Sequence, residues 1–153
     1  MKVFFRPFAT TLLLILISGF CSAQEVITWR FTAEQLNQRE AIIKLTAHLA
    51  PGWHLYSQHM KEGGPIPTTF TFNRTQDFEL IGGTLEQGKA EKFNDEIYEM
   101  EIVWYSDSVS FHQRIALYRP EASITGTINY MVCNSQMCLP QEKEFEIHVQ
   151  SFK

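Results

Sequence analysis

The stretch Ile124-Thr-Gly-Thr-Ile-Asn-Tyr130 leads directly into Met131-Val-Cys-Asn-Ser-Gln-Met-Cys138. In the first part, apolar and polar side chains alternate with the period of a β-strand that has one buried face. In the second part, two cysteines are separated by four residues, and Pro140 follows shortly after them. The stretch therefore predicts a strand that ends at a cysteine pair.

A period of two residues also runs through most of the chain on either side. Apolar and polar side chains alternate over 27–31, 41–49, 98–104, 109–117 and 145–149, and the runs 53–57, 68–72 and 78–81 are further candidate short strands. Pro51-Gly52, Gly82-Gly83 and the loop 63–67 supply turns between several of these runs. Only residues 32–39 offer a helical turn. The pattern predicts about eight to ten short strands and little helix.

Many short strands separated by turns predict an all-β fold, an immunoglobulin-like β-sandwich. The cysteines are too close in sequence to join two sheets, as the disulfide of antibody domains does. We therefore expect them on one strand and its turn, at a rim of the sandwich. The expected core residues are Trp29, Leu45, Leu49, Phe70, Ile102, Phe111, Ile128 and Ile147.

Residues 1–23 have the features of a secretory signal peptide. Two basic residues precede an apolar stretch over 11–20, and Cys21-Ser22-Ala23 ends in small residues suited to cleavage. An acylated Cys21 would define a lipoprotein instead, but the residue before it is the bulky Phe20. Cleavage after Ala23 is therefore the expectation.

Residues 24–153 are then expected to form one exported domain, long enough to bury a sizeable core. No stretch among them is long and apolar enough to span a membrane. They have 11 basic and 17 acidic side chains, a formal charge of −6, because two of the basic residues leave with the signal peptide. This balance argues against nucleic acid or an anionic membrane surface as a partner.

Cys133 and Cys138 are the cysteines that remain, and in an oxidising compartment they are candidates for a disulfide. A structural role is one interpretation, although closing so short a loop gives only about 2 kcal/mol on the chain-entropy model. Thiol-disulfide exchange is the other, since an accessible sulfur matters more for exchange than loop length does. The residues alone leave both open.

A soft metal site suited to Cu(I) is a further interpretation. The side chains that could join the two thiolates are His54, His59, Met60, Met131 and Met137. A blue-copper site would have a histidine a few residues after its cysteine, and Leu139-Pro-Gln141 has none. We therefore expect no metal and no cofactor.

Three segments in order resemble the N-terminal periplasmic domain of the DsbD family, the transmembrane thiol-disulfide reductases. They are Gly52-Trp-His-Leu-Tyr-Ser57, Asn94-Asp-Glu-Ile-Tyr98 and the cysteine segment from Tyr130 to Pro140. The resemblance implies an immunoglobulin-like domain in the periplasm. It also implies that the cysteine pair takes electrons from a thioredoxin-like or membrane thiol-disulfide reductase and passes them to exported disulfide proteins.

The same resemblance implies roles for individual residues. Cys133 and Cys138 match the redox pair, and Cys138 matches the cysteine that forms mixed disulfides with partners. Asp95, Glu96 and Tyr56 match side chains that support the site. Ile97 and Tyr98 fall where the family has an aromatic cap over the disulfide.

The chain departs from the best-known members in three places. It has one residue fewer between the cysteines, Ile97 in place of the cap phenylalanine, and Gln141 in place of a second proline. Since the sequence stops at Lys153, we also expect the electron donor to be a separate polypeptide.

Simpler interpretations of the supporting residues remain. Asp95 and Glu96 are also typical of a solvated turn, and Tyr56 and Tyr98 of core aromatics with a polar tip. If the carboxylates lie near the sulfurs, they disfavour a thiolate and raise its pKa. His54 is interpreted as an ordinary strand residue. The sequence thus supports either an electron-relay oxidoreductase or a non-catalytic binding module with a structural disulfide.

Overall fold

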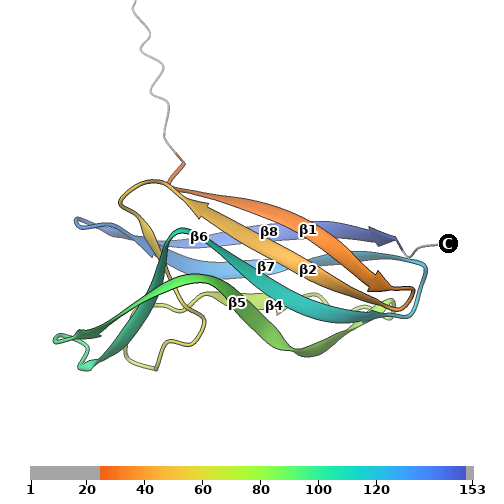
Figure 1. Cartoon of the computed structure of the whole chain (residues 1–153), viewed down its shortest axis with the longest axis horizontal. Helices are drawn as coiled ribbons and strands as arrows, with labels where there is room; N and C mark the ends of the chain where they lie inside the picture. Colours follow the sequence, from red (N-terminus) through yellow and green to blue (C-terminus); the bar gives the residue numbers. More distant parts are fainter. Residues whose placement is uncertain (1–24, 151–153) are drawn as a thin grey trace, which may run out of the picture.

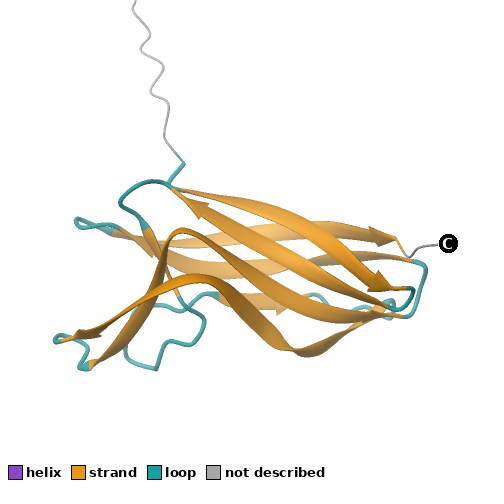
Figure 2. Cartoon of the chain, viewed as in Figure 1, coloured by secondary structure: helices purple, strands orange, loops and turns teal. Residues whose placement is uncertain are grey.

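The computed structural model describes residues 25–150, and within this range it contains eight strands and no helix. Figure 2 shows the strands extending over most of the chain. The strands are β1 (Ile27–Asn37), β2 (Glu40–Leu49), β3 (His54–Tyr56), β4 (Thr69–Phe72), β5 (Phe78–Asp95), β6 (Met100–Leu117), β7 (Glu121–Cys133) and β8 (Cys138–Gln150). The expected signal peptide lies outside the described residues.

The strands form two layers that are joined at one end (Figure 1). The first layer has the order β1-β2-β6-β5, and the second has the order β4-β7-β8, with every pairing antiparallel. The short strand β3 pairs with both β6 and β7, so it connects the layers. This arrangement confirms the predicted all-β, immunoglobulin-like β-sandwich.

The main core lies between the two layers and is built by alternate residues. On β2, Ile43 and Leu45 are part of it, and on β6 Phe111 fills its centre. Of the eight expected core residues, Leu45, Ile102, Phe111, Ile128 and Ile147 are buried, while Trp29, Leu49 and Phe70 are partly buried and pack against the main core. Ile102 belongs to a second, smaller cluster.

The predicted helical turn over 32–39 is wrong. These residues continue β1 as far as Asn37, with Thr32 opposite Lys44 and Glu34 opposite Ile42. The alternating apolar residues of β2 fix that strand in the core, and its free edge then pairs with the whole of β1. Pairing with a neighbouring strand outweighs a weak local preference for helix.

At two positions where the sequence predicts the end of a strand, the strand continues through a local irregularity. β5 continues through Gly82, which has φ 67°, and its register with β6 shifts between Ile81 and Leu85. The run 98–104, from Met100 onward, and the run 109–117 belong to the single strand β6, with Asp107 at φ 61° between them. Bulges of this kind bend long strands, and here they let β5 and β6 project beyond the main core.

Within residues 25–150, the structure has no helix able to cross a membrane. Figure 1 shows the β5–β6 and β7–β8 turns at the same end of the molecule. The cysteine pair lies at that end.

Candidate active site

The cysteines close the hairpin between β7 and β8. Cys133 and Cys138 are directly opposite each other and form a disulfide, with their Cα atoms 4.1 Å apart. The side chain of Asn134 shapes the turn, since its Oδ1 accepts hydrogen bonds from the backbone N–H groups of Gln136 and Met137. The disulfide therefore joins the last residue of β7 to the first residue of β8, whereas the sequence predicts both cysteines on one strand and its turn.

The two sulfur-bearing residues differ sharply in exposure. Cys133 is 1% exposed, whereas Cys138 is exposed and neighbours Met137, which is 52% exposed. A thiolate from another protein must approach the sulfur that it attacks. Cys138 is therefore the more accessible of the two cysteines.

Cys133 belongs to a second apolar cluster on the sheet face opposite the main core. Successive residues of a strand point to opposite faces. On β3, Leu55 packs in the main core and Tyr56 in the second cluster; on β7, Val132 and Cys133 divide in the same way. The second cluster comprises Tyr56, Ile102, Met131 and Cys133, with Met60, Phe93, Met100 and Trp104 packed against it.

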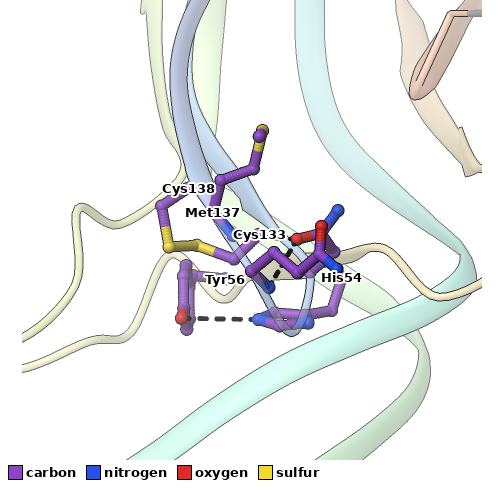
Figure 3. The surroundings of a disulfide bond; sticks show 7 residues. His54, Tyr56, Cys133, Met137 and Cys138 are labelled. Carbon is purple, nitrogen blue, oxygen red and sulfur yellow. Dashed lines mark hydrogen bonds between the residues drawn. A yellow bond between two sulfur atoms is a disulfide. The ribbon is translucent and has the colours of Figure 1, made fainter.

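Thioether side chains are concentrated around the disulfide. Met131 is buried in the second cluster, Met60 and Met100 pack against it, and Met137 lies next to Cys138 (Figure 3). Unbranched methionine side chains fill irregular gaps and contact aromatic rings favourably. Cys133 is therefore packed among polarisable, apolar side chains. Within residues 25–150, no group of three or more His, Cys, Asp or Glu is arranged to hold a metal ion.

The loop between β3 and β4, residues 57–68, is anchored beside this cluster. The carboxylate of Glu86 accepts hydrogen bonds from Ser57 Oγ at 2.9 and 3.0 Å, from the Gln58 N–H at 2.6 Å and from Tyr105 Oη at 2.7 Å. Burial and then the hydrogen bond to Glu86 raise the pKa of Tyr105. At the other end of the loop, Thr68 Oγ1 donates to the Tyr56 carbonyl at 2.6 Å. Both ends of the loop are thus fixed beside Tyr56, which belongs to the second cluster.

Tyr56 and His54 come from β3 and lie next to the disulfide (Figure 3). Their polar tips, Tyr56 Oη and His54 Nε2, are 3.4 Å apart. Burial raises the pKa of Tyr56, and the nearby Tyr98 and Asp95 add to this effect. Burial lowers the pKa of His54, while Glu91 acts in the opposite direction. Both side chains are therefore uncharged at neutral pH.

The segment expected to cap the disulfide forms the turn between β5 and β6. Asp95 Oδ1 accepts the backbone N–H groups of Ile97 and Tyr98, as Asn134 does in the neighbouring turn. Asp95 and Tyr98 lie near enough to Tyr56 to affect its pKa. Ile97 is 88% exposed and Glu96 is also exposed, so in this conformation Ile97 covers little of the protein.

The structure adds two residues that the sequence interpretation did not select. Glu86 lies in a part of the chain where the sequence predicts no strand, so no sequence signal marks its partly buried hydrogen bonds. His54 was interpreted as an ordinary strand residue. Its spacing of two from Tyr56 was the available signal, because residues i and i+2 of a strand share a face.

Comparison with known proteins agrees with the geometry. Residues 20–150 match the family described as "Thiol:disulfide interchange protein DsbD, N-terminal". A search of curated proteins found no match.

Three solved structures share the fold at low sequence identity. The N-terminal periplasmic domain of ScsB from Proteus mirabilis matches with a TM-score of 0.58 and 18% identity over 80% of this chain and 46% of that one, so the chain spans about half the length of that protein. The reduced N-terminal domain of DsbD from Neisseria meningitidis matches with a TM-score of 0.54 and 12% identity, over 82% and 87% of the two chains. The complex of DsbD and PilB N-terminal domains from the same organism matches with a TM-score of 0.57 and 12% identity, over 84% and 87%.

Proposed function

The chain belongs to the family of DsbD N-terminal domains, and from this premise we propose that it relays electrons by thiol-disulfide exchange through Cys133 and Cys138. The observation that carries the proposal is the disulfide itself, which has one exposed and one buried cysteine at the edge of a complete sandwich. We expect a sandwich with its own core to stay folded without this bond.

The exchange consists of two displacements. A donor thiolate attacks Cys138 Sγ, the bond to Cys133 breaks, and Cys133 leaves with the electron pair as a thiolate that is then protonated. A second donor thiol resolves the mixed disulfide, which leaves the pair reduced and the donor oxidised. The reduced pair passes the same two electrons to an oxidised acceptor by the reverse sequence.

The supporting residues have proposed roles that follow their positions. Asp95 fixes the β5–β6 turn, which places Tyr98 near Tyr56 beside the disulfide. Glu96 adds negative charge at this turn, and negative charge near a sulfur disfavours its thiolate. Ile97 is proposed as a cap that needs the turn to move toward Cys138, since it is exposed in this conformation.

The proposed partners follow from the relatives. A DsbD N-terminal domain of Neisseria meningitidis forms a complex with the PilB N-terminal domain, and the similar domain of ScsB is periplasmic. We propose by analogy that this chain acts in the periplasm as a thiol:disulfide oxidoreductase. Its donor would be a thioredoxin-like or membrane thiol-disulfide reductase, and its acceptors would be oxidised exported proteins.

The first test is thermal unfolding of the protein with and without a reductant. Exchange requires both redox states to be folded, so we expect the reduced protein to keep a cooperative transition and to lose only about 2 kcal/mol of stability, because the closed loop is short. A protein that unfolds when the disulfide is reduced would support the competing interpretation, a binding module with a structural disulfide.

A further inference from the structure

His54 lies in a row of paired residues that includes the disulfide. Across four adjacent strands, Ser106 is opposite His54, His54 is opposite Cys133, and Cys133 is opposite Cys138. Directly paired residues of antiparallel strands point to the same face, with Cβ atoms about 4.5–5.5 Å apart. His54 and Cys133 are therefore neighbours on the same face of the sheet, and this is the arrangement that proton transfer directly or through one water requires.

Aromatic neighbours fix the orientation of the imidazole. Its ring centre is 3.8 Å from that of Trp104 with an angle of 32° between the planes, and the Tyr56 ring meets it edge-on at 5.3 Å. The hydrogen bond between His54 Nε2 and Tyr56 Oη is 3.4 Å long. A ring held on two sides keeps one position relative to Cys133.

Among the titratable side chains near Cys133, His54 is the one that is able to accept a proton. Burial lowers the pKa of His54, so its imidazole is neutral at neutral pH and can accept a proton, and the facing carboxylate of Glu91 opposes this only in part. Tyr56 has a raised pKa and stays protonated. The Asp95 carboxylate accepts two backbone N–H groups of its own turn. Cys133 is almost completely buried, so bulk water has little access to its thiol.

We propose that His54 is the base that deprotonates Cys133 when the mixed disulfide with an acceptor is resolved. The Cys133 thiol gives its proton to His54 Nε2, in the tautomer that carries its hydrogen on Nδ1 and with the Tyr56 hydroxyl turned away from this 3.4 Å contact. The Cys133 sulfur then attacks Cys138 Sγ. The Cys133–Cys138 bond forms, the bond between Cys138 and the acceptor sulfur breaks, and the acceptor sulfur leaves as a thiolate with the electron pair. This inference rests on the proposed function and deepens it, because it assigns the base of one step.

The test uses the reduced full chain and the aromatic disulfide dithiobis-nitrobenzoate, which releases a coloured thiolate at each displacement. The first release reports attack by Cys138, and the second reports attack by Cys133 on the mixed disulfide. We expect His54→Gln and His54→Phe to slow the second release on the order of tenfold to a hundredfold at neutral pH and to leave the first unchanged. His54→Phe keeps the stacking on Trp104, and His148→Gln on the exposed surface of β8 is the matched control.

The pH profile separates a base from a structural residue. With His54 present, the second release should stay fast from pH 8 to below pH 6.5, because a base with a lowered pKa remains unprotonated over that range. Without His54, the rate should fall with decreasing pH in proportion to the thiolate fraction, which for an ordinary cysteine is centred near about pH 8.5. An unchanged second release in both variants, or equal slowing of both releases, would overturn the proposal.

The experiment distinguishes a failure of this inference from a failure of the proposed function. Chemically reduced protein shows the two releases whether or not the pair exchanges electrons with proteins. An unchanged second release together with an exchange-type reduction potential would refute the role of His54 alone. A slowed second release together with the potential of a structural disulfide would refute the electron relay alone.

Discussion

A Cys133→Ser variant is expected to accumulate a mixed disulfide with a thioredoxin-like protein, whereas Cys138→Ser is expected to accumulate almost none. The reason is the difference in exposure, since Cys138 is accessible and Cys133 is 1% exposed. Without Cys133, a disulfide formed through Cys138 has no internal thiol to resolve it. We expect the adduct yields of the two variants to differ by roughly tenfold or more, in line with the accessibility of the reacting sulfur.

The trapping experiment uses a thioredoxin in which serine replaces the second active-site cysteine and the remaining cysteine carries thionitrobenzoate as a mixed disulfide. The free cysteine of the variant attacks the thioredoxin sulfur, and thionitrobenzoate leaves as a thiolate with the electron pair, so that the adduct forms without an added oxidant and neither protein can resolve it. Acid quenching, alkylation and non-reducing electrophoresis then measure the yield. Equal yields from both variants would show that burial of Cys133 does not direct attack. A higher yield from Cys138→Ser would reverse the assignment of the two sulfurs.

Glu86→Ala is expected to cause the largest loss of stability among substitutions near the site. Its carboxylate accepts hydrogen bonds from Ser57, Gln58 and Tyr105, which join the 57–68 loop to β5 and β6. A buried donor that loses its acceptor lowers the free energy of unfolding by about 1–3 kcal/mol, and at a half-buried site water can replace part of the lost hydrogen bonding. We expect a net loss of about 2–4 kcal/mol in urea denaturation.

The same substitution should also affect the cysteine site, because the loop carries Met60 against the cluster around Cys133. In reduced protein with Cys138→Ser, we expect Glu86→Ala to speed alkylation of Cys133. Glu144→Ala, at an exposed position on β8, is the control and should change neither stability nor alkylation appreciably. A change of less than about 0.5 kcal/mol for Glu86→Ala, the range of ordinary surface substitutions, would contradict the anchoring role.

The sequence predicts the sandwich because period-two alternation is a direct consequence of burying one face of each strand. The same reasoning fails at 32–39, where the polar residues of β1 have no strong pattern of their own and follow the strong pattern of β2. It also divides β6 in two at Asp107, since a bulge interrupts the alternation without ending the strand. The alternation of apolar and polar residues thus predicts which side chains are buried, but it does not predict how far a polar strand pairs along the edge of the sheet.

The candidate site could be found from the sequence only in part. The cysteine pair and the segment around Asp95 are visible as short motifs, and the structure places Asp95 and Tyr98 near Tyr56. The positions of Glu86 and His54 depend on contacts between strands that are distant in the sequence, such as the pairing of His54 with Cys133. No local pattern encodes such contacts. The difference in exposure between Cys133 and Cys138 likewise emerges only when β3, β6 and β7 come together.

The reduction potential of the Cys133–Cys138 couple, measured by titration with glutathione or dithiothreitol and quantified by alkylation, tests the central claim most directly. An electron relay must be reducible by its donor and oxidisable by its acceptors, so we predict a potential above about −300 mV, in the range of exchange proteins. A potential below about −300 mV, typical of structural disulfides, would contradict the account and identify the bond as a staple of the β7–β8 hairpin.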